Sequence, residues 1–73
     1  TLNEMELENL KIQFEDCINM AQKARENFLM CSELELDEME SEIYYDESKK
    51  LKTRIKEIKR IIKNINKKLD ESE

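Results

Sequence analysis

The sequence contains no glycine, no proline and no histidine. Glycine and proline supply most tight turns and left-handed backbone conformations, so their absence argues against sheets and loop-rich folds. Histidine is the commonest acid–base group and metal ligand, so its absence argues against many catalytic and metal sites. The sequence also lacks a run of about 18 apolar residues, so no membrane-spanning helix is expected, and no signal peptide is visible.

Charged residues dominate what is present. The chain has 73 residues, of which 42% are charged and 38% hydrophobic. A chain rich in Glu, Lys, Leu and Ile and free of helix breakers is typical of long helices and coiled coils. We therefore expect an all-α fold with one coiled-coil domain over residues 1–73. Because the chain starts at Thr1 rather than Met, a fragment of a larger protein is one interpretation.

Two cysteines, Cys17 and Cys31, are present. Two thiols cannot complete a four-ligand metal site or form a disulfide framework. They are expected to be small apolar residues of a protein in a reducing, intracellular setting, the cytoplasm or the nucleus. Carboxylates cluster around Glu33–Glu38 but lack the loop geometry of calcium or catalytic sites. We expect no enzyme activity, no metal, no cofactor and no small-molecule substrate.

The charge is divided between two halves of the chain. Residues 1–47 hold 14 acidic and 3 basic residues, a net charge of −11, whereas residues 48–73 hold 10 basic and 4 acidic residues, a net charge of +6. Overall acidity argues against general affinity for nucleic acid. The asymmetry predicts that the halves contact each other or partners of opposite charge.

Apolar residues form three stripes with heptad spacing. The first stripe consists of Leu7, Leu10, Phe14, Cys17, Ala21, Ala24, Phe28 and Cys31. The second stripe consists of Leu36, Met39 and Ile43. The third stripe consists of Leu51, Ile55, Ile58, Ile62, Ile65 and Leu69. The heptad register slips by one residue between the first and third stripes, so the helix either carries discontinuities or ends and restarts.

The stretch Tyr44–Ser48 is the predicted turn, because the apolar stripe pauses there and Asp46 or Ser48 is suited to cap a new helix. This gives helix 1 over about residues 2–44 and helix 2 over about residues 48–70. Thr1-x-x-Glu4 and Asn3-x-x-Glu6 both fit a capping box at the start of the first helix. The similar pattern Ser32-x-x-Glu35 is interpreted as a solvated turn within the helix.

Antiparallel folding about residue 47 pairs the second stripe with the third. The predicted pairs are Ile43 with Leu51, Met39 with Ile55, Leu36 with Ile58, and then residues 32 with Ile62 and 29 with Ile65. The same folding places acidic side chains beside basic ones. Exposed ion pairs of this kind favour the antiparallel orientation of the helices but add little to the stability of the fold. A helical hairpin and an antiparallel dimer of straight helices give the same contacts. The pause and the register slip favour the hairpin.

In this arrangement much of the first stripe extends beyond helix 2 and lacks a covering partner. We therefore expect a homo-oligomer, a dimer or larger, or a helical protein partner. The residues expected to make this contact are Leu7, Leu10, Phe14, Cys17, Ala21, Ala24 and Phe28. The function indicated is a non-enzymatic interaction and oligomerisation module that acts as a scaffold or spacer.

Two alternatives remain open. A small acidic regulator or inhibitor could use the acidic half to occupy a basic groove of a target protein. The basic helix over residues 49–68 could instead bind nucleic acid or an anionic membrane. Against that second alternative, its basic residues surround the helix, and no aromatic residues are interspersed for stacking.

Overall fold

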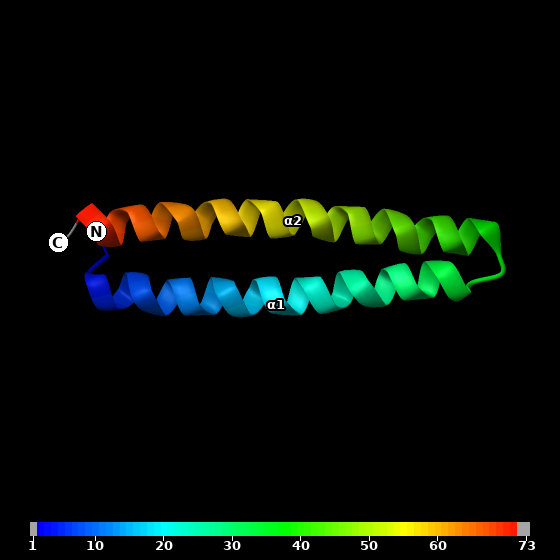
Figure 1. The fold of residues 1–73 in the computed structure, drawn as a ribbon, viewed down its shortest axis with the longest axis horizontal. Helices are drawn as coiled ribbons and strands as arrows, with labels where there is room; N and C mark the ends of the chain where they lie inside the picture. Colours follow the sequence, from blue (N-terminus) through cyan, green and yellow to red (C-terminus); the bar gives the residue numbers. More distant parts are fainter. Residues whose placement is uncertain (1, 72–73) are drawn as a thin grey trace.

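A computed structural model describes residues 2–71, which form two long helices joined by a short turn. Helix α1 spans Glu4–Leu34 and helix α2 spans Glu38–Glu71. The helices lie antiparallel, so the start of α1 and the end of α2 lie together at the end opposite the turn (Figure 1). The molecule is a rod of 55 × 15 × 14 Å. The predicted all-α antiparallel hairpin is confirmed.

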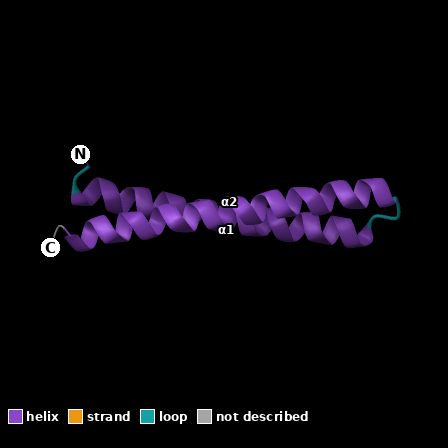
Figure 2. Ribbon diagram, turned by 90° about the horizontal axis from the view of Figure 1, so that it is seen from above, coloured by secondary structure: helices purple, strands orange, loops and turns teal. Residues whose placement is uncertain are grey.

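The two helices stay in contact along their whole length. Viewed from above, they cross at a shallow angle near the middle of the rod (Figure 2). With 31 residues in α1 and 34 in α2, the arms are almost equal in length. Neither arm therefore extends far beyond the other, and the apolar stripe of each helix has a partner helix along its length.

Helix α1 begins after one of the two predicted N-terminal caps, Asn3, and the other, Thr1, lies outside the described residues. Asn3 has an extended backbone, and its side-chain oxygen accepts a hydrogen bond of 2.8 Å from the backbone N–H of Glu6. The Asn3 amide in turn donates to the Glu6 carboxylate at 2.9 Å. These contacts satisfy a backbone donor that the first helical turn cannot satisfy itself.

The turn lies at residues 35–37, and the predicted turn at Tyr44–Ser48 is wrong. Helix 1 ends at Leu34 rather than near residue 44, and α2 continues without a break through residues 44–48. Asp37 caps the new helix, because its carboxylate accepts from the backbone N–H groups of Met39 at 2.9 Å and Glu40 at 3.4 Å. The register slip seen in the sequence therefore reflects a helix that ends and another that starts.

Polar residues on the seam of α2 explain why the apolar pattern pauses in the sequence at Tyr44–Ser48. Ser41, Tyr44 and Ser48 continue the three–four spacing of the third stripe toward the turn and lie on the face of α2 that packs against α1. Tyr44 packs against Phe28 with ring centroids 6.4 Å apart. Ser48 is only 2% exposed, and its hydroxyl donates to the Tyr45 carbonyl at 2.6 Å. A small, internally bonded side chain at this position lets the helices approach closely.

A pair of serines fixes the register of the two helices near the turn. The Ser32 hydroxyl donates to the Ser41 carbonyl at 3.1 Å, and the Ser41 hydroxyl donates to the Ser32 carbonyl at 2.8 Å. The interpretation of Ser32-x-x-Glu35 as a solvated turn within the helix is wrong, because α1 ends at Leu34, Glu35 is extended, and Ser32 is half-buried against α2. Because the helices are antiparallel, residues whose numbers sum to 73 lie level with each other along the rod.

The core is narrow. Within residues 2–71, the buried apolar side chains are Leu7, Ile18, Ile55 and Ile65. Ile18 takes the place in the seam that heptad spacing assigned to Cys17, which is exposed. In the same range, no helix carries an apolar stretch long enough to cross a membrane.

Candidate protein interface

The first apolar stripe mostly faces α2. Leu7 is buried, and a half-buried set follows it along α1: Leu10, Phe14, Ala21, Ala24 and Phe28. The prediction that most of this stripe lacks a covering helix in the same chain is therefore wrong, because the early turn brings the whole of α2 against it. Cys17 and Cys31 remain exposed at the edge of this stripe.

The second stripe is exposed, and its predicted pairing with the third stripe is wrong. Leu36, Met39 and Ile43 are 98%, 76% and 57% exposed. Leu36 lies in the turn, while Met39 and Ile43 belong to the same continuous helix as the third stripe, so they cannot fold back onto it. The third stripe packs against α1 instead, with Ile55 and Ile65 buried and a half-buried set of Leu51, Ile58, Ile62 and Leu69.

One flank of the helix pair carries a hollow that we call the apolar groove, with a volume of about 440 Å³. Its lining consists of Phe14, Cys17, Met20, Ala21, Arg54, Glu57, Ile58 and Ile61. Cys17 and Ala21 are small, so α1 leaves space opposite Ile58 that no side chain of the hairpin fills. Arg54 and Glu57 pair at 3.7 Å at its polar border. An open groove lined by Met, Ile and Phe is suited to take apolar side chains from another helix.

The opposite flank carries a second hollow, which we call the basic groove, with a volume of about 350 Å³. Its lining consists of Arg25, Leu29, Tyr45, Ser48, Lys49, Lys52, Thr53 and Lys56. Among the residues that the structure describes, none that lines this groove is acidic. The Lys49 ammonium lies 4.5 Å above the Tyr45 ring, and the buried Arg25 Nε has no hydrogen-bond partner within residues 2–71.

The turn end of the rod, residues 26–47, forms an acidic tip. It contains nine acidic and no basic residues. Five of its apolar side chains are exposed: Met30, Leu34, Leu36, Met39 and Ile43. Next along the rod lie residues 17–25 and 48–56, which contain seven basic and no acidic residues. The molecule thus has an acidic, apolar tip beside a basic middle.

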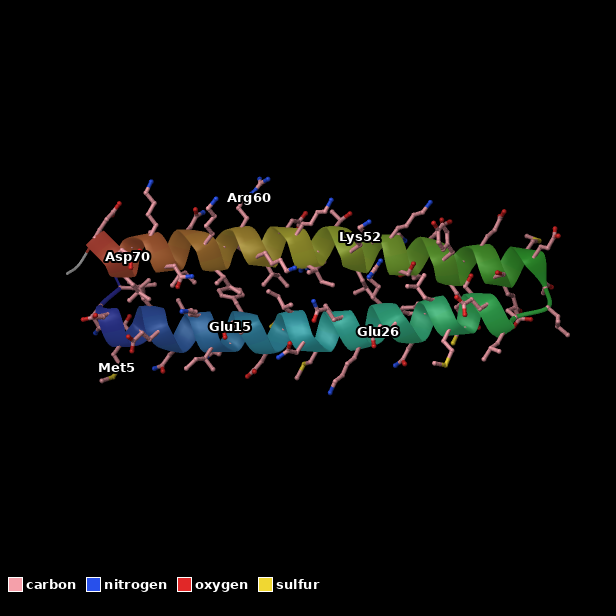
Figure 3. All side chains as sticks on the ribbon, viewed as in Figure 1. Met5, Glu15, Glu26, Lys52, Arg60 and Asp70 are labelled. Atoms are coloured by element: carbon pink, nitrogen blue, oxygen red, sulfur yellow. The ribbon has the colours of Figure 1, made fainter. Side chains whose placement is uncertain are left out.

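The outer faces of the two helices differ in character. Met5 points away from α2, whereas Arg60 points away from α1 (Figure 3). The exposed Ile12 lies one heptad after Met5, so helical spacing places it on the same outer face of α1. These scattered apolar residues on α1 lie outside both grooves and provide matched positions for testing which surface is used.

Sequence reasoning missed three features of this surface. The true turn carries a signal in Asp37-x-x-Glu40, where an N-cap aspartate precedes a glutamate by three residues. Ile18 is larger and more apolar than its neighbour Cys17. Assigning Ile18 rather than Cys17 to the heptad position would have identified the residue that is buried against α2. The basic groove joins Arg25 to lysines of α2, and only the correct turn brings these residues together.

Within residues 2–71, no group of three or more cysteine or acidic side chains is placed to hold a metal ion. The candidate site is composed of the apolar groove and the neighbouring tip. No protein-family model matches the chain, and neither the comparison with curated proteins nor that with solved structures gave a match.

Proposed function

We propose that this chain is a non-enzymatic interaction and oligomerisation module, which acts as a scaffold or spacer through coiled-coil packing of its helices. The observation that carries this proposal is the mismatch between the narrow core and the large exposed apolar surface. The residues buried inside the hairpin are few, while large apolar side chains remain exposed along the apolar groove and the acidic tip. Such surfaces commonly mark contacts with other proteins.

The size of the hairpin supports the same conclusion. Below about 70–80 residues, a single core rarely supplies more than about 3–5 kcal/mol of stability, and natural small proteins add disulfides, metals or association. Cys17 and Cys31 are free, so no disulfide supports this core. Burial of the apolar groove by another helix would add the missing apolar contact. The two exposed thiols fit a reducing, intracellular setting.

The test is the mass in solution, by light scattering coupled to gel filtration over a concentration series under reducing conditions. Met20→Glu places a charge in the apolar groove, and Met5→Glu is its matched control on the outer face of α1, because the two side chains are 71% and 73% exposed. We expect the unmodified chain and Met5→Glu to form a dimer or larger species. Met20→Glu should lower the association constant of the dimer by at least about tenfold. A monomer at every concentration, or equal effects of both substitutions, would contradict the proposal.

A second candidate function rests on the acidic tip alone. Nine acidic and no basic residues in residues 26–47 give a surface suited to a basic groove on a target protein, so the chain would act as an acidic regulator. Contact of this kind would weaken steeply as salt concentration rises. It is distinguished from self-association by a monomeric mass combined with salt-sensitive binding to a basic protein.

A further inference from the structure

We propose that the apolar groove is occupied by the acidic tip of a second copy of this chain, in a two-fold symmetric, antiparallel and staggered dimer. This inference rests on the proposed oligomerisation function and specifies its partner and geometry. In this dimer α1 packs against α1 of the other copy, and α2 against α2. Cys17 of each copy faces Cys31 of the other.

Helical spacing gives the flank and the register. Cys17, Ala24 and Cys31 lie at intervals of one heptad and therefore share the groove-side flank of α1. When Cys17 faces Cys31 of an antiparallel copy, Ala24 faces Ala24 at the symmetry axis. Small side chains at all three positions let the two α1 helices approach closely. An isologous contact of this kind makes both tip-to-groove contacts at once.

The same register brings opposite charges together on α2. The Ser32–Ser41 contact sets residue 17 level with residue 56 and residue 31 level with residue 42. Residues 37–47 of one copy therefore lie level with residues 51–61 of the other. The first range holds six acidic and no basic residues, and the second holds five basic residues and one acidic residue. An in-register parallel dimer would instead place each acidic tip beside the other acidic tip.

Apolar residues also coincide in this register. Leu34 in the tip lies level with Phe14 of the other copy, which lines the apolar groove. Ile43 of the tip lies level with Ile55 of the other copy, next to Arg54 at the groove border. Leu34 and Ile43 of the tip would thus cover the part of the groove that the hairpin leaves open.

The contact is large enough for a specific dimer. The copies overlap over about 22 residues of each helix, or about 33 Å at 1.5 Å per residue. On a rod about 15 Å wide this buries roughly 500 Å² on each copy, or roughly 1,000 Å² in total, which reaches the lower range of specific interfaces.

The test uses the two natural thiols, both of which are exposed. Cys17→Ser leaves only Cys31, and Cys31→Ser leaves only Cys17. Each variant is treated with a short thiol-specific bis-maleimide, first alone and then after the two variants have been refolded together in equal amounts. Thiols of the same kind would lie about 21 Å apart in the dimer, since they are separated by 14 residues of helical rise, whereas unlike thiols face each other.

We expect neither variant to cross-link when it is treated alone. The mixture should yield cross-linked dimer, at most from about half of the chains, because random pairing places about half of the chains in mixed dimers. Cross-linking of each variant with itself would indicate a parallel dimer and overturn the inference. A dimeric mass without any cross-link in the mixture would place the contact on another face and also overturn it, while leaving the oligomerisation function intact. A monomeric mass would instead contradict the proposed function itself.

Discussion

The apolar groove and the basic groove flank the same helix seam and have similar volumes, yet their lining side chains interact with water differently. The first exposes Met20 and Ile61 to water, which is unfavourable until another surface covers them. The second is bordered by Lys49, Lys52 and Lys56, whose ammonium groups are well hydrated and whose stems cover apolar surface. Hollows of similar size therefore leave exposed apolar side chains on one flank and hydrated charged side chains on the other.

The difference arises from which residues each helix contributes. On the apolar flank, the residues of α1 include the small Cys17 and Ala21. Opposite them α2 has Ile58 and Ile61, so the space between the helices stays open and apolar. On the basic flank, α1 offers Arg25 and Leu29, which are long enough to fill much of the space. Both flanks depend on the seam between them, so the comparison can be tested first at the seam and then on each flank.

The largest effect is expected from Ile55→Asp, which removes the seam under both grooves. Ile55 is buried against α1, and a carboxylate there would be unpaired in an apolar contact, at a cost of at least about 3 kcal/mol in a small core. We expect loss of helicity by circular dichroism at 25 °C. Ile12→Asp, at an exposed position on the outer face of α1, is the control and should stay helical. Equal melting curves for the two variants would show that the seam does not hold the hairpin together.

An intermediate effect is expected at the floor of the basic groove. Ser48→Leu inserts a larger side chain at a position that is fully packed against α1, and such overpacking costs about 1–3 kcal/mol. Thr53→Leu adds a similar volume at an exposed position lining the same groove and should change stability little. Urea denaturation measures both. If Ser48→Leu raised the urea midpoint, the close approach of the helices at this point would not be a packing constraint.

The smallest effect is expected from single lysines on the two flanks. Lys52 lies in the basic groove among like charges, so Lys52→Gln should raise the free energy of unfolding by a few tenths of a kcal/mol. Lys50 pairs with Glu47 at 3.0 Å on the surface, so Lys50→Gln should lower it by a similar amount. The two urea midpoints should therefore move in opposite directions at low salt and converge at 1 M salt. Shifts of the same sign would contradict this account of the basic groove.

The architecture could be predicted from the sequence because it depends on strong, repeated signals. The absence of Gly and Pro and the regular Leu and Ile spacing indicate long helices. The unequal charge of the two halves did not indicate the pairing, because the turn at residues 35–37 folds the acidic residues 26–47 onto one another. The capping box at Asn3 is a local pattern, and local patterns of this kind can be read from four residues.

The position of the turn could not be predicted from the apolar stripe, because the seam of α2 includes residues that are not apolar. Ser41 and Ser48 contribute close approach and hydrogen bonds rather than apolar area, so a search for Leu and Ile stops short of them. The error of about ten residues then changed the pairing of every stripe. Both grooves combine residues of α1 and α2, so they could be recognised only after the pairing was known.

The turn at residues 35–37 joins the helices without a left-handed residue, since no residue in the described part of the chain has a positive φ. Helices commonly end at a left-handed residue, usually a glycine, which other residues replace at an energetic cost. Here two carboxylates hold the turn. Asp37 caps α2, and Glu35 accepts a hydrogen bond of 3.1 Å from the backbone N–H of Asp37, while Leu36 projects almost fully into solvent. The tip is therefore a natural place to graft an epitope or a fluorophore, because a substitution at residue 36 changes what the molecule displays without changing how it folds.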